Sequence, residues 1–421
     1  MFRLSFTLLV ATLIGVLTTS WNFDFEALSE ILTKKTLTNE YVNVDEGNDE
    51  AINFLALGDW GGAPLIDTLP DQVKNAAGMG RVAREINADF VVTLGDNFYL
   101  TGVENVDSKR FQETFENVYS DKSLMDIPWY MIGGNHDHFG NIDAQIQYTT
   151  SKYNTNKRWK FPSLYHAHSF VSKSKEGDNN NDDSNKRVTI DLIMIDTVDL
   201  CSKNEIIDEE DERYSNPLPL LPKSHAANNG EQWQWIEDQM SKSQADYLLV
   251  AGHYPVFSVC IQGPTKTLIH HLRPLLLKYG AHYLAGHDHC MNHFVEHDQN
   301  SDSTKSSDIL PLKQENANIQ IAELQNEVNY ILVGTGIDCC SPAWNRNNKH
   351  IPGNVQLTWS KTHENNSGHF FWKKVKSGFA SFSATKNGLN VQYHDHKGNT
   401  LYEAKLIKPR KKKTSGFVET K

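Results

Sequence analysis

The chain has 421 residues and a formal net charge of −11, from 41 basic and 52 acidic side chains. Hydrophobic residues make up 39% of it, enough for a sizeable core, so wholesale disorder, a collagen-like repeat and a long coiled coil are excluded. Because this acidic balance provides no overall positive field to replace the counterions of a nucleic acid, we expect no nucleic-acid partner. The 18 histidines direct attention to metal ligands.

The first 20 residues contain the one long apolar stretch of the sequence. Arg3 supplies a positive start, residues 4–17 are an apolar run of 14 residues, and Thr18 and Ser20 are small residues at cleavage positions. This pattern predicts a secretory signal peptide over residues 1–20. An uncleaved signal anchor is the alternative, but a membrane span needs about 20 residues. We therefore expect a mature protein without a stable membrane span, secreted or routed to a lysosome or vacuole.

After an acidic lead-in over residues 21–50, short apolar runs alternate with helix-like stretches, which indicates βαβ units. Near the C-terminus, turn sequences separate the apolar runs, which favours β-hairpins. The sequence thus predicts an α/β (α+β layered) domain over residues 51–408. The expected strands are residues 52–57, 90–94, 127–132, 188–195, 247–251, 281–285, 379–385, 389–394 and 401–406, and the expected helices are residues 71–87, 109–119, 232–242 and 266–279.

Polar segments interrupt this alternation near residues 173–186, 202–229 and 298–327. Loops of this length in a compact domain are usually functional or disordered, so we expect insertions there. Residues 409–421 form a basic tail, expected to be solvated, with heparin binding or sorting as the alternatives. Asn365 lies in an Asn-Asn-Ser sequon, which predicts a glycoprotein if the chain is secreted.

Polar side chains follow five of the expected strands, each just behind a glycine. Ligand sites in α/β sheets form at the carboxyl ends of strands, and glycine lets the chain turn sharply and approach a ligand closely. A single Gly-Asp is usually a turn, but five such elements at five strand ends indicate one site. Their oxygen and nitrogen donors suit iron, zinc or manganese, and their number suggests two ions bridged by a carboxylate. The residues are Asp59, Asp96, Asn135, His136, His253, His287 and His289.

This set resembles the signature of the metallophosphoesterases. Tyr99, three residues after Asp96, makes it similar to the purple acid phosphatases, and specifically to the small mammalian-type tartrate-resistant acid phosphatases. The resemblance extends over about residues 52–408. It implies a four-layer sandwich in which two mixed β-sheets are flanked by helices. A general metallophosphoesterase with zinc alone is the alternative.

The resemblance also implies a dinuclear centre of Fe(III) with Fe(II), Zn or Mn. The expected activity is that of an acid phosphatase: a metal-activated hydroxide hydrolyses phosphate monoesters, either small molecules or phosphoproteins. The implied ligands of Fe(III) are Asp59, Asp96, Tyr99 and His289, and those of the divalent ion are Asp96 as a bridge, Asn135, His253 and His287.

Two further residues resemble parts of the family's site. His136 resembles the histidine that binds phosphate or protonates the leaving alkoxide, with a packing histidine as the alternative. Gln262 precedes Gly-Pro-Thr, where the related enzymes have another histidine. Gln can hydrogen-bond phosphate but cannot donate a proton as an acid, which leaves the pH optimum open.

The segment 202–229 stands where the family has a protease-sensitive repression loop, which implies a protease as partner; a plain solvated loop is the alternative. The family also has a cysteine near Cys201 and another near Cys260, which implies a disulfide between them. Two other functions stay open. One is a scaffold like the membrane-anchored relatives that have lost ligands, which the complete ligand set disfavours. The other is a phosphodiesterase or nuclease, which Tyr99 disfavours.

Overall fold

The computed structural model describes residues 51–62, 69–173, 187–201, 229–297, 327–363 and 376–410. The predicted signal peptide, the lead-in segment, the sequon at Asn365 and nearly all of the polar insertions and the basic tail lie outside these residues. Among the described residues, no helix is both long and apolar enough to cross a membrane.

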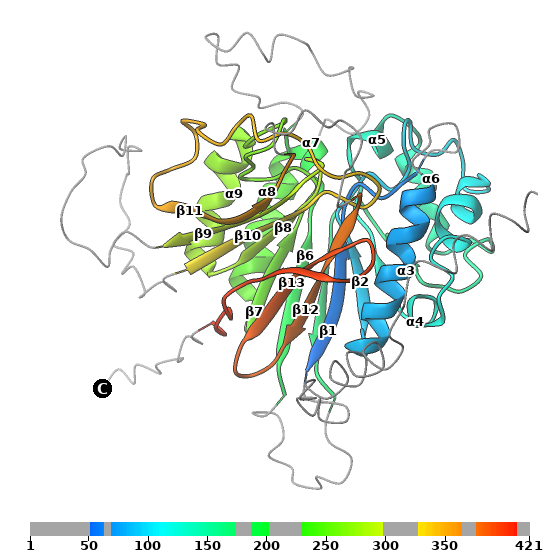
Figure 1. Cartoon of the computed structure of the whole chain (residues 1–421), viewed down its shortest axis with the longest axis horizontal. Helices are drawn as coiled ribbons and strands as arrows, with labels where there is room; N and C mark the ends of the chain where they lie inside the picture. Colours follow the sequence, from blue (N-terminus) through cyan, green and yellow to red (C-terminus); the bar gives the residue numbers. More distant parts are fainter. Residues whose placement is uncertain are drawn as a thin grey trace, which may run out of the picture. The chain divides into compact units, whose positions relative to one another are not determined.

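Two seven-stranded mixed sheets form the centre of the described structure (Figure 1). The first sheet has the order β14-β13-β12-β1-β2-β3-β4 and the second the order β11-β9-β10-β8-β7-β6-β5. The strands of the first sheet are β1 (Ile52–Leu57), β2 (Phe90–Thr93), β3 (Trp129–Tyr130), β4 (Trp159–Lys160), β12 (Gly378–Ala384), β13 (Leu389–Asp395) and β14 (Thr400–Glu403). Those of the second are β5 (His166–Val171), β6 (Thr189–Met194), β7 (Tyr247–Ala251), β8 (His282–Ala285), β9 (Met291–His297), β10 (Glu327–Val333) and β11 (Val355–Lys361).

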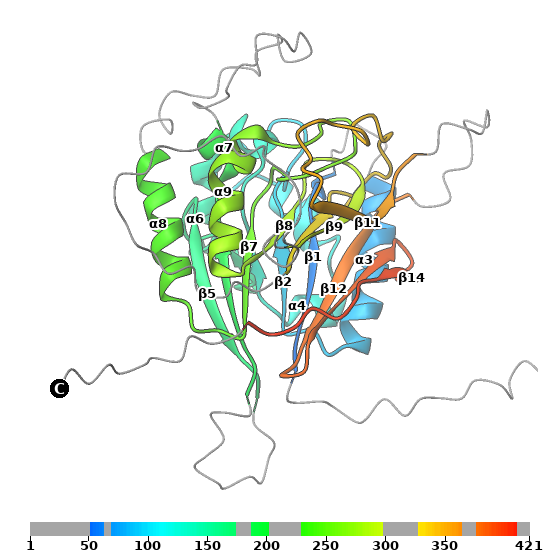
Figure 2. The same ribbon diagram turned by 90° about the vertical axis from the view of Figure 1, so that its left-hand side faces the viewer.

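Helices cover the outer faces of both sheets, so the layers run helix, sheet, sheet, helix (Figure 2). In Figure 2, α3 lies on one side of the strands and α8 and α9 lie on the other. The described helices are α3 (Leu69–Glu85), the π-helical turn η1 (Phe111–Glu116), α4 (Lys122–Met125), α5 (Asn135–His138), α6 (Ile142–Tyr148), α7 (Thr197–Cys201), α8 (Asn229–Lys242) and α9 (Lys266–Tyr279).

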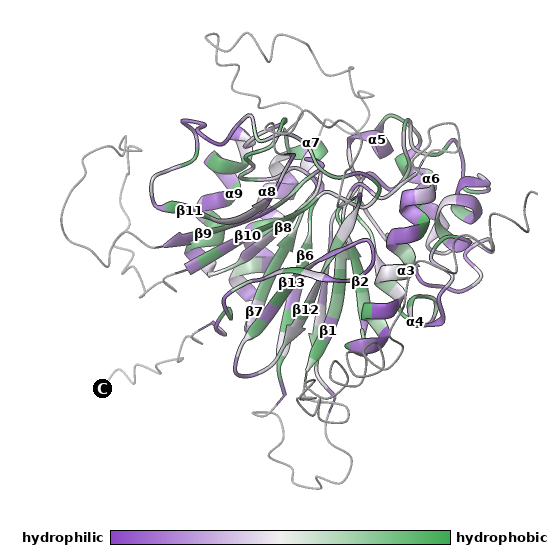
Figure 3. Cartoon of the chain, viewed as in Figure 1, coloured by the Kyte–Doolittle hydropathy of each residue, from purple (hydrophilic) through white to green (hydrophobic). Residues whose placement is uncertain are grey.

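The alternation of strand side chains explains the two sheets and their helices. In β1, Phe54 and Ala56 lie in the core between the sheets, whereas Leu55 and Leu57 pack in the core that includes α3. Such a strand is apolar on both faces, as expected for a buried parallel strand. Figure 3 shows hydrophobic residues along β1 and β7, while α3 has both kinds. The predicted four-layer sandwich is therefore confirmed.

The strand topology brings the catalytically relevant loops to one edge. Strands β1, β2 and β3 are parallel neighbours in the first sheet, and β6, β7 and β8 are parallel neighbours in the second. The carboxyl ends of the two sets meet, since Gly58 after β1 donates its N–H to Val333 at the end of β10, at 2.8 Å. A Cβ on Gly58 would lie 2.9 Å from the Cα of Gly286, so only glycine fits where the sheets cross.

Most predicted elements are present, with some corrections. Strands β1 and β7 and helix α9 match their predicted bounds. The helix expected over residues 109–119 is shorter, the π-helical turn η1, and the polar segments end earlier than expected because Asn229 begins α8 and Glu327 begins β10. Five strands were not predicted, namely the two-residue β4 and the longer β5, β9, β10 and β11, in which polar residues interrupt the apolar pattern.

Candidate metal centre

The seven predicted ligands come from the loops after five strands and lie close together in two groups. Asp59 follows β1, Asp96 and Tyr99 follow β2, and Asn135 begins α5 after β3. The loops after β7 and β8 supply the imidazoles. These are His253, His287 and His289.

The first group consists of Asp59, Tyr99 and His289. The Tyr99 hydroxyl lies 3.0 Å from Asp59 Oδ1 and 2.9 Å from His289 Nε2, and these two partners are 3.5 Å apart. Donors bound at about 2.1 Å to one ion, at right angles to each other, are about 3 Å apart. The three atoms therefore fit one face of a single metal ion. A phenolate and a carboxylate suit a highly charged ion.

The second group consists of Asn135 and His253, beside Asp96. Asn135 Oδ1 lies 3.0 Å from His253 Nε2, which in turn lies 3.5 Å from Asp96 Oδ1. His287 is nearby, with its ring centroid 5.0 Å from that of His253. Ligand atoms of Asp59, Asp96 and His253 all lie within 4.8 Å of one another, which joins the two groups. Asp96 is thus placed between them, as a bridging carboxylate requires.

The electrostatics of the first group show why it suits a cation. Burial raises the pKa of Tyr99 well above its usual value, and the charges of Asp59 and Asp96 raise it further. A phenolate at this position therefore requires a strong positive charge beside it. Burial also raises the pKa of Asp59, but the hydrogen bond and charge of His289 outweigh burial and lower that pKa to about 2.

The histidines differ in protonation. Burial lowers the pKa of His289, but its hydrogen bond to Asp59 and the charges of Asp59 and Asp96 outweigh this and raise it to about 9. Burial lowers the pKa of His287 well below its usual value, and the charge of His253 adds to the effect. His287 is therefore neutral and ready to act as a ligand, whereas His289 has its proton to exchange for a metal ion.

The backbone that presents three of these ligands is in the left-handed region. The φ angles of Asp59, Asp96 and His287 are 57°, 53° and 73°. Such conformations are uncommon outside glycine and cluster at functional sites. At Gly134 a Cβ would lie 2.2 Å from Asp96 Oδ1, so a glycine there lets the β3 loop approach the Asp96 carboxylate. The glycines predicted to permit close approach do so here.

His136 lies beside the centre without belonging to either group. Its Nδ1 is 2.6 Å from the carbonyl oxygen of Leu100, so Nδ1–H donates there, and its backbone N–H donates to Asp96 Oδ1 at 2.9 Å. Its Nε2 lies 4.0 Å from Asp96 Oδ2, and 27% of the side chain is exposed. This histidine therefore lies beside the candidate centre, and its ring also packs against that of Tyr99, with 4.5 Å between the ring centroids.

Gln262 is an exposed residue. Unlike His136, it reaches the centre through a contact between its backbone and Asp288. Its backbone N–H donates to Asp288 Oδ1 at 3.3 Å, and Asp288 stands between the ligands His287 and His289. The structure thus places the Gln262 loop next to the ligand pair.

Two buried carboxylates that were not predicted from the sequence accept hydrogen bonds from several loops of the site. Asp137 accepts the N–H groups of Gly134, Asn97 and Phe98 at 2.8 to 3.2 Å, as well as the Gln145 amide at 2.9 Å. It therefore joins the loops after β2 and β3. The second is Asp288, whose donors include the Ser258 hydroxyl at 2.6 Å. Both are sequence neighbours of proposed ligands, in the runs Asn135–His138 and His287–His289.

The segment 335–341 and Arg110 were also missed. Ile337 donates its N–H to the Asp59 carbonyl at 3.1 Å, and Ser341 donates to the His289 carbonyl at 2.7 Å. Arg110 binds the carbonyls of Tyr99 and Gly62. The Gly-Thr-Gly sequence at 334–336, which follows an apolar run, could have indicated the segment 335–341.

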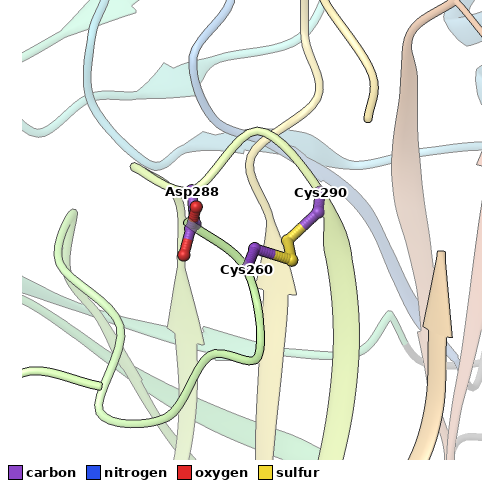
Figure 4. Close-up of side chains that lie close together, drawn as sticks. All are labelled: Cys260, Asp288 and Cys290. Atoms are coloured by element: carbon purple, nitrogen blue, oxygen red, sulfur yellow. A yellow bond between two sulfur atoms is a disulfide. The ribbon is translucent and has the colours of Figure 1, made fainter. Parts of the chain in front are cut away.

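The cysteines correct one expectation. Cys260 is bonded to Cys290 and Cys339 to Cys340, so the pairing of Cys201 with Cys260 is wrong. Cys201 is buried at the end of α7. Figure 4 shows the Cys260–Cys290 bond joining the loop after β7 to the start of β9, next to Asp288. Because these sulfurs are bonded to each other, the cluster of Cys260, Asp288 and Cys290 is no second metal site.

Comparisons with known proteins agree with this geometry. The calcineurin-like phosphoesterase family matches residues 52–291. Tartrate-resistant acid phosphatase type 5 of Oryctolagus cuniculus is 35% identical over 369 residues, 87% of this chain and 94% of that protein. The Homo sapiens protein of the same name is 34% identical over 86% of this chain and 92% of its own length. Purple acid phosphatase 4 of Arabidopsis thaliana is more distant, at 26% over 84% of this chain and 83% of that protein.

Among solved structures, GAP50, the anchor in the inner membrane complex of Plasmodium, has a TM-score of 0.58 and 21% identity, covering 86% of this chain and 90% of that one. This likeness shows the fold alone. The relatives with purple acid phosphatase names imply a dinuclear metal centre, and the two donor groups fit one. The chain therefore belongs to the calcineurin-like phosphoesterase family, and it is a phosphoester hydrolase of the acid phosphatase kind.

Proposed function

We propose that this protein is a purple acid phosphatase that hydrolyses phosphate monoesters at an Fe(III)–M(II) centre, where M is iron, zinc or manganese. The observation that supports this most directly is the position of the Tyr99 hydroxyl, within 3.0 Å of both Asp59 and His289. A phenolate among these donors suits Fe(III). The proposed ligands of the two ions are those derived from the sequence, with Asp96 shared.

The two ions, when bound, supply positive charge for the phosphate oxygens and an activated water for attack at phosphorus. The residues of the chain do the rest. His136 holds a proton at Nε2 and delivers it to the leaving oxygen, because its Nδ1 is committed to the Leu100 carbonyl. Gln262 is proposed to hydrogen-bond the phosphate.

Substrates are proposed to be small phosphomonoesters or phosphoproteins. Secretion, or delivery to a lysosome or vacuole, is proposed from the signal-peptide pattern of residues 1–20, and cleavage of the acidic segment 202–229 by a protease is proposed to relieve obstruction of the site. A scaffold without activity is the second candidate, and the complete set of donor atoms disfavours it.

The test is the metal content and visible spectrum of the purified protein. We expect about two ions per chain, one of them iron, and a purple or pink colour from the phenolate on Fe(III). Tyr99→Phe should remove the visible band. Tyr247→Phe is the matched control, since Tyr247 is also buried but its hydroxyl binds the Thr385 carbonyl, and it should keep the band. A colourless, fully active zinc enzyme would refute the iron assignment.

A further inference from the structure

The loop over residues 258–263, next to the metal centre, is held in place by three contacts. The Cys260–Cys290 disulfide joins it to the start of β9. The Asn345 side chain donates to the carbonyls of Cys260 and Ile261 at 2.6 and 3.1 Å. The third fastening is the buried carboxylate of Asp288, which has 1% of its surface exposed.

Asp288 differs from the other two fastenings because it belongs to the ligand run itself. It lies between His287 and His289 in the sequence, and its carboxylate accepts three donors of the loop. These are the Ser258 hydroxyl at 2.6 Å, the Gly263 N–H at 3.1 Å and the Gln262 N–H at 3.3 Å. An acceptor with a full charge makes such hydrogen bonds stronger than those between neutral groups.

Two features show that the loop depends on this carboxylate for its shape. The N–H groups of Gln262 and Gly263 both point to the one side chain, so the backbone turns around it. Gly263 has a φ of 74°, which places the loop in a conformation that few other residues adopt. A Cβ there would also lie 2.7 Å from the Asn345 side chain. Asp288 thus binds the backbone of Gln262 directly, while the disulfide and Asn345 hold the residues before it.

We infer that Asp288 is a positioning residue: its carboxylate holds the loop 258–263 in register with His287 and His289, and so sets where Gln262 meets the phosphate. The inference rests on the proposed function, because it gives Gln262 a contact with phosphate. The inference goes beyond the proposed function because it attributes phosphate affinity to a side chain that is a ligand of neither the metal ions nor the substrate.

The experiment measures binding of inorganic phosphate to the metal-loaded protein by calorimetry, together with hydrogen exchange of the Gln262 and Gly263 amides. Asp288→Asn keeps the shape but removes the charge. We expect both amides to exchange faster, the two metal ions to remain, and phosphate to bind about 10-fold more weakly, which corresponds to one hydrogen bond with a charged group. In turnover, KM should rise more than kcat falls.

A double-mutant cycle separates positioning from a general structural defect. If Asp288 acts through Gln262, then Asp288→Asn combined with Gln262→Ala should bind phosphate within about 2-fold of Gln262→Ala alone. Ser258→Ala is a milder variant that leaves the ligand run untouched, and it should weaken phosphate binding by about 2- to 5-fold. Asp246→Asn is the control: Asp246 is also buried but binds Thr189 and Lys386 before β7, at the opposite end of that strand from His253.

The outcomes are distinguishable. If the unsubstituted protein takes up metal ions but binds no phosphate, the proposed function fails, and faster amide exchange in Asp288→Asn would still support the fastening of the loop. If the unsubstituted protein binds phosphate, and Asp288→Asn leaves both amide exchange and phosphate affinity unchanged, the inference is wrong. Multiplicative losses in the double variant, or a loss in Ser258→Ala no greater than in Asp246→Asn, would also overturn it.

Discussion

Loops of the first sheet carry the proposed oxygen ligands of the metal centre, whereas loops of the second carry the proposed imidazole ligands. In the first half, Asp59, Asp96, Tyr99 and Asn135, one carboxylate, Asp137, accepts backbone N–H groups from the loops after β2 and β3, and Arg110 and Ile337 bind the carbonyls of Tyr99 and Asp59. In the second half, His253, His287 and His289, the neighbouring loop 258–263 is held by Asp288, Asn345 and a disulfide.

The two halves should therefore differ in how strongly a single substitution destabilises them. Removing a charged acceptor leaves buried donors without a partner, which costs more than the bond itself contributes. In the first half, several such donors depend on Asp137. In the second half the loss of one fastening leaves the others in place. We therefore expect single substitutions in the first half to be the more damaging.

The largest loss of activity is expected from a substitution of Asp96, which lies between the two groups of donors. Asp96→Ala removes the carboxylate that lies near the donors of both groups, so both ions should be lost and turnover should fall by at least about 10⁴-fold. Metal analysis and phosphatase assays check this. One fully retained ion with substantial activity would show that the halves are independent and that Asp96 is no bridge.

His136→Ala should lower the rate by about 10²- to 10⁴-fold while both ions remain, because His136 lies beside the centre with only its backbone bonded to Asp96. The comparison to make is kcat for an aryl and an alkyl phosphate, since the poor alkyl leaving group needs the proton more. Parallel loss of metal and activity would place His136 among the ligands instead.

Asp137→Asn tests the support of the first half. Because the amide cannot accept at both ends, it leaves N–H groups of Gly134, Asn97 or Phe98 without an acceptor, and we expect a loss of about 1–3 kcal/mol in the free energy of unfolding. Urea denaturation measures it. Asp288→Asn should cost less, and Asp238→Asn at a partly exposed position on α8 should change stability by under about 0.5 kcal/mol. Equal costs at Asp137 and Asp288 would remove the contrast between the halves.

Replacing both Cys260 and Cys290 by serine tests the support of the second half. The bond closes a loop with a sequence separation of 30, so its loss should lower stability by about 2–4 kcal/mol. His289, which lies 2.9 Å from the Tyr99 hydroxyl, directly precedes Cys290, but its carbonyl is also held by the Ser341 N–H, so the visible band should stay unchanged. A shifted band in this variant would mean that the loop 258–263 also shapes the first half.

Much of the fold was predictable because local patterns agree with burial. The continuous apolar run 247–251 is β7, and the amphipathic stretch 266–279 ends where Gly280 takes a left-handed conformation, as α9 does. Strand β9 was missed because side chains such as Asn292 and His293 are buried through tertiary hydrogen bonds, which no period in the sequence reveals.

The sequence by itself determined the chemistry of the site: which donors follow which strands, and that Tyr99 stands three residues after Asp96. It could do so because ligands at parallel strand ends need only the strand and its following loop to be recognised. Only the tertiary structure decided which cysteines pair and which carboxylates hold the loops. Those relations join residues such as Cys260 and Cys290, or Asp137 and Asn97, that are distant in the chain and meet only after the two sheets have packed together.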